Sequence, residues 1–240
     1  MKKIFILIGS RNKKGNTFTF TNKLLSNLYE KCDIEYAFPQ DYKIEFCDGS
    51  NTCFFDTSYH LEEDLNKLQN KITKSDLLII GSPVYVHSMS ADLKLIIERL
   101  AWWTHTLRLQ GKPTVILSTC GSNGSNTVLT QLRDIITFMG GNVIAATNAS
   151  QFPNKLNNEE WIEDESRQLC KCINKYLSLG SQSNQILEKV FQTCKSNILK
   201  QKSAREQFGD VFGELNYWEE TGMINYEQFK DYLEYTKTNN

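Results

Sequence analysis

The chain has 240 residues, with 27 lysines and arginines against 28 aspartates and glutamates, and a formal net charge of −1. Its 40% hydrophobic and 23% charged residues are typical of a globular protein and exclude a wholly disordered chain. A nearly neutral chain lacks the basic footprint of proteins that bind nucleic acid or anionic membranes, so we expect neither partner. At roughly 150 residues per domain, the length predicts one large domain, or one domain with an appendage.

The amino-terminal segment does not have the pattern of an export signal. Its apolar run, residues 4–8, is shorter than the roughly 7–15 residues of a signal peptide core and has no small-residue cleavage site after it. The seven cysteines are odd in number and irregularly spaced, unlike a secreted disulfide framework. No apolar stretch approaches the roughly 20 residues that cross a bilayer. We therefore expect a cytoplasmic protein.

Residues 1–153 alternate between short apolar runs and segments with helical spacing. The runs typical of buried strands are 4–8, 77–80, 114–118 and 142–146, with a weaker one at 34–38. Apolar residues recur at helical spacing over 17–29, 61–72, 91–102 and 128–138. This alternation requires parallel pairing, because each helix returns the chain to the same end of the sheet. We predict an α/β domain with an open parallel sheet of about five strands and helices on both faces.

Residues 154–240 contain no convincing strand and form a predicted helical extension. Amphipathic spacing indicates helices over 159–179, 184–202 and 226–236. The segment 180–183 separates the first two, with Ser183 or Asn184 available as an N-cap. We expect this extension to pack on the domain or on a dimer partner.

Ligands of open α/β sheets bind beyond the carboxyl ends of the strands, where the winding reverses. The loop 9–17 follows the first strand there and matches neither the phosphate loop of NTPases nor the dinucleotide fingerprint. It offers several backbone N–H donors, together with the polar side chains of Ser10, Asn12, Asn16 and Thr17. Such donors at a helix N-terminus suit a terminal monophosphate. The alternative is a plain strand–helix turn with Thr17 as N-cap.

Two further loops end at the same predicted edge. In 81–90, Pro83 makes the chain leave its strand rigidly, and Tyr85 and Val86 are displayed where a flat ring could lie. Simple packing is the alternative for these two side chains, while Ser90 is expected to cap the next helix. The loop 118–126 consists of small hydroxyl residues and glycine, which let a ligand approach the main chain, or else form a flexible linker.

The loops resemble those of the NAD(P)H-dependent FMN reductase and iron–sulfur flavoprotein branch of the flavodoxin-like superfamily. The matching stretches are Gly9-Ser10-Arg11, Gly15-Asn16-Thr17, 81–85, 89–94, 97–99 and 111–113. Over roughly residues 1–150, this resemblance implies a flavodoxin-like fold that binds FMN. The residues it implies for the phosphate are Ser10, Arg11, Asn12, Asn16 and Thr17. Those it implies for the ring are Pro83, Val84, Tyr85 and Val86, with Thr119, Cys120 and Gly121 at the other edge.

The sequence departs from this family at two places. The iron–sulfur members carry four close cysteines before the third strand, whereas this chain has only Cys47 and Cys53 there. A cluster normally takes four thiolates, so we expect none; the two thiols are remnants, a redox pair or weak metal ligands. Cys170 and Cys172 diverge on a helix and the histidines are scattered, so no metal site is expected. Family members commonly follow the tyrosine with an aromatic residue and glycines, where this chain has Val86-His87-Ser88.

The resemblance implies an NAD(P)H-dependent flavin oxidoreductase. NADH or NADPH would deliver a hydride through FMN to a small organic acceptor such as a quinone, a flavin, a nitro or azo compound or an activated double bond. His87 and Tyr85 are candidates for supplying a proton, although His87 also fits a plain exposed loop residue. The alternatives are an FMN-binding electron-transfer protein and a reductase of dehydroamino acids in a modified peptide. Because family members often build the flavin site across a dimer interface, we expect a homodimer or higher homo-oligomer.

Overall fold

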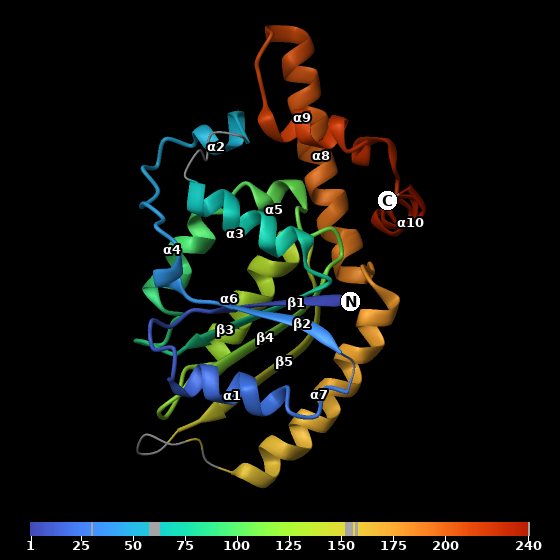
Figure 1. Ribbon diagram of the computed structural model, residues 1–240. Helices are drawn as coiled ribbons and strands as arrows, with labels where there is room; N and C mark the ends of the chain where they lie inside the picture. Colours follow the sequence, from blue (N-terminus) through green and yellow to red (C-terminus); the bar gives the residue numbers. More distant parts are fainter. Residues whose placement is uncertain (30, 58–62, 152–155, 157, 240) are drawn as a thin grey trace.

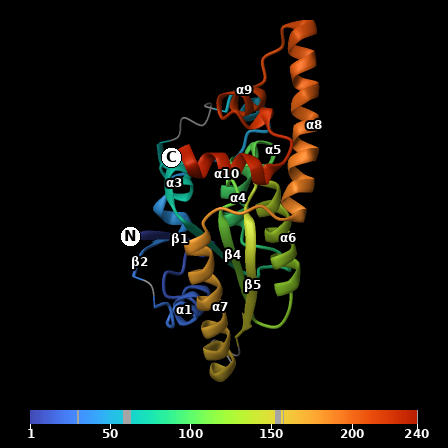
Figure 2. The same ribbon diagram turned by 90° about the vertical axis from the view of Figure 1, so that its right-hand side faces the viewer.

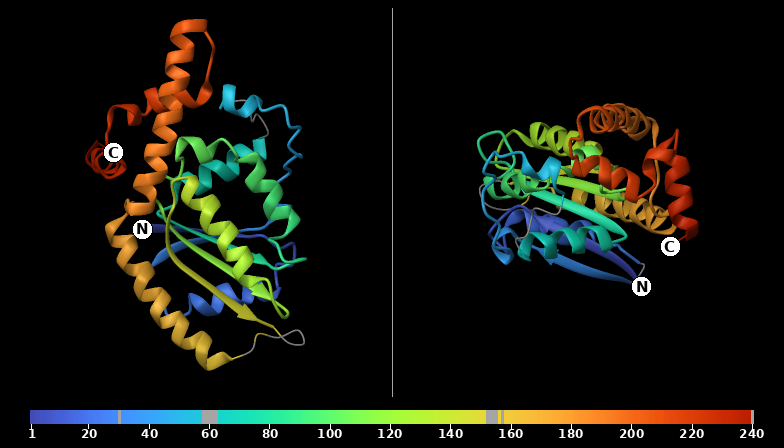
Figure 3. Two further views of the ribbon diagram at one scale, coloured as in Figure 1. Left: turned by 180° about the vertical axis from the view of Figure 1, so that it is seen from behind. Right: turned by 90° about the horizontal axis from the view of Figure 1, so that it is seen from above.

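The computed structural model describes residues 1–29, 31–57, 63–151, 156 and 158–239. Its sheet consists of β1 (Lys2–Ile8), β2 (Cys32–Ala37), β3 (Leu77–Pro83), β4 (Pro113–Cys120) and β5 (Asn142–Ser150). The strands pair in parallel in the order β2-β1-β3-β4-β5 and run in one direction across the molecule (Figure 3). The winding therefore reverses between β1 and β3. This is the predicted open sheet of the flavodoxin-like class, which is confirmed.

Helices cover both faces of the sheet (Figure 1). On one face lie α1 (Asn16–Leu24) and α7 (Glu159–Leu179), and on the other lie α3 (Glu63–Lys74), α4 (Ala91–Arg99) and α6 (Ser125–Phe138). In β1, Ile4, Ile6 and Ile8 belong to the core under α1 and α7, whereas Phe5 and Leu7 belong to the opposite core. The strand is buried on both sides, which explains why its sequence is almost continuously apolar.

Two predicted helices end earlier than their apolar spacing indicates. The helix predicted over 17–29 ends at Leu24, and the one predicted over 91–102 ends at Arg99. In both, the amides beyond the end bond three residues back, as in Leu100 N–H to Ile97 O (3.0 Å). Such bonds tighten the last turn and stop the helix, which the spacing of apolar side chains does not report. The short α5 (Trp103–Thr106) follows the second helix, while the predicted start at Leu61 lies outside the described residues.

The carboxyl-terminal helices pack on the domain. They are α7, α8 (Gln185–Phe208), α9 (Gly213–Glu220) and α10 (Phe229–Asn239), of which α9 was not predicted from the sequence. Asn184 caps α8 as predicted, because its side-chain oxygen accepts from Leu187 N–H (3.0 Å). Phe191 of α8 stacks on Trp218 and Phe229. The backbones of α9 and α10 accordingly lie beside the long helix α8 (Figure 2). The predicted boundary at 153/154 lies outside the described residues, and α7 shares one core with α1.

Short elements complete the described chain. They are η1 (Pro39–Asp41), α2 (Thr52–Phe55) and η2 (Met223–Asn225). Of the helices in the described residues, none has both the length and the apolar content that crossing a bilayer requires.

An ion pair between His105 and Glu214 connects α5 to α9. His105 Nδ1 lies 2.6 Å from the carboxylate of Glu214, which is buried. This hydrogen bond raises the pKa of His105 above its ordinary value of 6.5, against a smaller lowering by burial. The folded state therefore favours the protonated imidazole. Its contribution to stability is complete below the ordinary pKa and is lost as the pH rises through the raised value.

We predict that the free energy of unfolding falls with rising pH more steeply in the native protein than in the variant His105→Gln. Glutamine can still donate to Glu214 but does not titrate, so it serves as the matched control. Urea unfolding between about pH 5.5 and pH 8.5 measures both slopes. Parallel slopes would show that this ion pair contributes nothing that depends on pH.

Candidate functional site

Three loops meet at the carboxyl ends of β1, β3 and β4, and we call this region the rim. Gly9 N–H donates to Gly81 O (2.6 Å), which joins the first loop to the second. Val84 N–H donates to Thr119 O (2.8 Å), which joins the second to the third. The hydroxyls of Thr17 and Thr119 lie 2.7 Å apart and are buried, which joins the third to the first. The candidate residues from three distant segments are thus neighbours.

The first loop is held by its own polar groups. Ser10 Oγ accepts from Asn12 N–H (3.2 Å), and Asn12 Oδ1 accepts from Lys14 N–H (3.1 Å). Gly15 is the N-cap of α1, so the alternative in which Thr17 takes that position is wrong. The first bond of helical type runs from Thr19 N–H to Gly15 O (2.9 Å). The amides before it have no partner inside the helix, which makes the start of α1 a place for an anion.

Besides Thr17, two of the candidate phosphate residues have side-chain partners elsewhere in the chain. Arg11 forms a bidentate pair with Asp92 at the start of α4, with Nη2 2.8 Å and Nε 3.0 Å from the carboxylate oxygens. Its side chain remains 69% exposed. Asn16 Nδ2 donates to Gln151 Oε1 (2.5 Å), just after β5. Both pairings orient side chains at the rim, and Arg11 would share its charge between Asp92 and any phosphate.

The second loop forms a tight hairpin whose tip is strained. Tyr85 and Ser88 exchange two backbone hydrogen bonds (2.9 and 3.0 Å), and between them Val86 and His87 have φ of +49° and +59°. Positive φ at both central positions is normally met by Asn or Gly, and it is costly for a β-branched valine. Nevertheless Val86 is 97% exposed and Tyr85 57% exposed. Strain of this kind at an exposed apolar tip is typical of a ligand-contacting segment.

The third loop supports the hairpin from below. Gly124 has φ +89°, and a Cβ there would lie 2.6 Å from Val84 Cγ1 and 3.3 Å from His87 Cα. Only glycine therefore fits under the hairpin. Thr119 and Cys120 are buried, and their carbonyl oxygens accept from Val84 N–H (2.8 Å) and Gln151 N–H (2.9 Å). Gly121 is exposed with open space around it.

Two further residues of the rim were not predicted from the sequence. Asp92 orients Arg11, and Gln151 orients Asn16. Gln151 directly follows the fifth strand and therefore lies at the same edge of the sheet, so its position in the sequence could have indicated a place at the rim. Asp92 lies in the stretch that carries the family resemblance. Its pairing with Arg11, 81 residues earlier in the chain, could not be predicted from that stretch.

The cysteine loop does not offer the ligands of an iron–sulfur cluster. Cys47 and Cys53 line a cavity of about 280 Å³ with Glu98 and Arg99 at the end of α4. Two thiols are fewer than the four a cluster takes. Within the described part of the chain, no group of three or more His, Cys, Asp or Glu side chains is placed to hold a metal. His60 lies outside that part.

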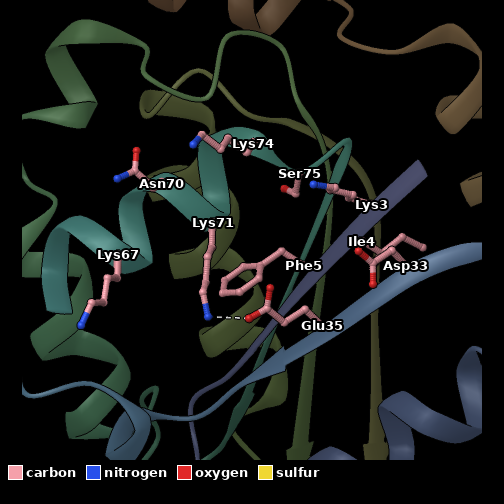
Figure 4. A pocket seen from close by; sticks show the side chains of 10 residues that line it. All are labelled: Lys3, Ile4, Phe5, Asp33, Glu35, Lys67, Asn70, Lys71, Lys74 and Ser75. Carbon is pink, nitrogen blue, oxygen red and sulfur yellow. Dashed lines mark hydrogen bonds and ion pairs between the residues drawn. The ribbon is translucent and has the colours of Figure 1, made fainter. Parts of the chain in front are cut away.

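A cavity of about 340 Å³ lies at the opposite end of the sheet, between α3 and the edge strand β2 (Figure 4). Lysines of α3 and carboxylates of β2 face each other across it, and Lys71 pairs with Glu35 at 2.5 Å. Its four lysines outnumber its two carboxylates. It lies far from the turns at which ligands bind in this fold. We therefore locate the candidate site at the rim.

The sheet order and the loops at its carboxyl edge define a protein of the flavodoxin-like class. Residues 2–153 match the family of NADPH-dependent FMN reductases, and the chain belongs to this family.

Two flavoproteins are related to the chain in sequence, and a solved structure shares its fold. An iron-sulfur flavoprotein of Archaeoglobus fulgidus is 31% identical over 47% of this chain, which spans only about half (51%) of that protein. An iron-sulfur flavoprotein of Clostridioides difficile (strain 630) is 25% identical over 92% of this chain and 99% of its own. The structure of RosB with bound 8-demethyl-8-formylriboflavin-5′-phosphate superposes with a TM-score of 0.54 at 20% identity, over 88% of this chain and 90% of that one. This last likeness shows the fold.

We predict that Gly124→Ala destabilises the FMN-free protein by roughly 1–3 kcal/mol, because the new methyl group collides with Val84 in a strained backbone. Gly121→Ala is the matched control in the same loop, since nothing lies within 4 Å of its added Cβ. It should change the free energy of unfolding by less than about 0.5 kcal/mol. Chemical denaturation measures both, and equal effects would mean that the hairpin does not rest on Gly124.

Proposed function

We propose that this protein is an NAD(P)H-dependent oxidoreductase that holds FMN at the rim and reduces a small organic acceptor. The observation that carries the proposal is the set of hydrogen bonds that makes three loops one surface, with an anion site at the start of α1 beside an exposed hairpin. FMN, when bound, supplies the two-electron chemistry that the side chains lack. The family match and the flavin phosphate bound to RosB support the same cofactor.

The residues of the rim fit the two ends of such a cofactor. Main-chain amides of the first loop, with Ser10, Asn12 and Thr17, suit a phosphate whose charge is met by the helix N-terminus and by Arg11. Tyr85 and Val86 offer apolar surface to a ring, and exposed Gly121 leaves the other edge accessible to main-chain contact. Pro83 and the bond from Val84 N–H to Thr119 O hold the base of the hairpin. The hairpin therefore loses little conformational entropy when a ligand binds.

The surroundings of the site bear on the acceptor and on assembly. A ring held at the rim suits a small acceptor such as a quinone, a flavin or an azo compound, and the exposed Tyr85 and Val86 offer a surface that a second subunit could cover. We propose a homodimer on this basis, acting in the cytoplasm. NADPH is the reductant that the family name favours.

Rapid mixing with NADPH and with NADH tests the reaction directly. We expect the flavin absorbance of the FMN-loaded protein to bleach within seconds with at least one of them and to return on adding a quinone. An FMN-loaded protein that stays oxidised with both would instead support an electron carrier, and a protein that ignores added FMN would refute the site.

We predict that Thr17→Val weakens FMN binding roughly tenfold, because it removes a hydroxyl from the phosphate loop and its bond to Thr119. Thr21→Val is the control: it changes a buried threonine of the same helix whose hydroxyl donates only to Thr17 O (2.8 Å). Fluorescence titration of FMN measures both affinities. The proposal fails at this point if the two variants bind FMN equally well.

His87 is the candidate for delivering a proton to a reduced acceptor, because it is exposed at the hairpin tip beside the proposed ring contacts. We expect His87→Ala to lower turnover roughly 100-fold with acceptors that need a proton, and to leave ferricyanide reduction unchanged. Steady-state assays with a quinone and with ferricyanide compare the two. Unchanged quinone turnover would exclude His87 from the reaction.

A further inference from the structure

We propose that a second cavity, at the amino end of β4, binds a small oxyanion such as phosphate. The cavity has a volume of about 200 Å³ and is lined by Thr73, Arg108, Leu109, Gln110, Lys112 and Ser181. Its residues belong to the end of α3, the loop before β4 and the link between α7 and α8, at the end of the sheet opposite the rim. The site is therefore additional to the proposed flavin site.

Arg108 brings a cation that has no counter-ion among the described residues. Its guanidinium carbon lies 5.0 Å from the ring centre of Tyr217 and 5.8 Å from that of Trp102. These rings cover the flat faces of the guanidinium and leave its N–H edges for other partners. In the described chain Arg108 has no ion pair or hydrogen bond, and its Nε is buried. A buried donor of this kind is costly unless a partner binds it.

Lys112 brings a second cation, which is 8% exposed. Its amine donates to Thr73 O (3.3 Å) and to Ser75 O, and an ammonium has a third donor to offer. Burial lowers the pKa of Lys112 to about 8, so the amine is still mainly protonated near neutrality. The nearby Asp76 is already engaged, because its oxygens accept from Lys2 Nζ (3.0 Å) and Lys3 N–H (2.8 Å).

The walls of the cavity are fixed before any ligand arrives. Gly111 N–H donates to Gly140 O (2.7 Å), and Gln182 N–H donates to Gly111 O (2.9 Å). Gln110 Nε2 donates to the hydroxyls of two tyrosines of α9 and α10, at 3.0 Å each. The link 180–183, which carries Ser181, is therefore attached to the loop before β4. A ligand here would stabilise the contact between the sheet and the carboxyl-terminal helices.

The chemistry of the lining selects the class of ligand. Two cations and the hydroxyl of Ser181 donate, and the described lining contributes no carboxylate. The volume is below the roughly 300–1,000 Å³ of cavities that hold drug-sized molecules. A tetrahedral dianion fits both conditions, because its several oxygens accept from a guanidinium edge and an ammonium together.

The test measures the melting temperature of the full chain in saturating FMN against rising potassium phosphate, with ionic strength held constant by potassium chloride. We expect a saturable rise in the native protein, because a ligand that binds only the folded state stabilises it. Arg108→Gln and Lys112→Met should each weaken the apparent affinity for phosphate roughly 10- to 100-fold. Lys74→Gln, an exposed lysine of the neighbouring cavity, should leave it unchanged.

For each variant, the melting temperature with phosphate is compared with that of the same variant without phosphate, so a change in the variant's own stability does not affect the result. Because two variants are measured, the test still holds if one of them fails to fold. No saturable rise in the native protein would overturn the proposal, as would a native response retained in both variants. A rise that is seen only when FMN is left out, and that is retained in both variants, would assign the anion to the first loop of the rim instead. The result does not depend on whether the protein reacts with NADPH.

Discussion

The buried pair of hydroxyls on Thr17 and Thr119 is the contact on which the candidate site depends. It joins the first turn of α1 to the end of β4 at 2.7 Å, across 102 residues of sequence. Both hydroxyls are shielded from water, so neither can exchange its partner for solvent without a cost. The carbonyl of Thr119 also anchors the hairpin through Val84. One residue at the end of a central strand thereby aligns an anion site with an apolar tip.

The two ends of the sheet differ in what they can bind. At the carboxyl ends, glycines and small hydroxyl residues expose main-chain donors, and the strained Val86-His87 tip stands in solvent. At the amino ends, buried Lys112 and stacked Arg108 gather positive charge beneath the helices of the extension. The first arrangement suits a phosphate with an attached ring, and the second suits a compact anion. Ser181 of the extension lines the second of these regions.

The carboxyl-terminal helices share the hydrophobic cores of the sheet domain and do not form a separate unit. Ile162, Leu169 and Ile173 of α7 enter the same core as Ile6 of β1. Phe191 of α8 enters the core on the other face, together with Trp218 and Phe229. Removing α7 would expose the part of β5 and α1 that it covers, and removing α8 would expose the aromatic side chains of α9 and α10 that pack on it. The family match over residues 2–153 thus covers only part of one folded unit.

The sequence alone determined the sheet, the order of its elements and the three loops. The reason is that the spacing of apolar residues indicates both the alternation of strands and helices and the burial of strands on two sides. It also indicated Asn184 as a cap, since capping is a local hydrogen bond. It did not determine the ends of α1 and α4, which depend on the hydrogen bonds of the last turn. Nor did it determine α9, whose Trp218 is buried against Phe191 of α8 and donates to His105 O of α5 (2.9 Å). The partners of Arg11 and Asn16, the strain at Val86 and the pairing of two cations near β4 were decided by tertiary structure, because each joins residues that only the folded sheet brings together.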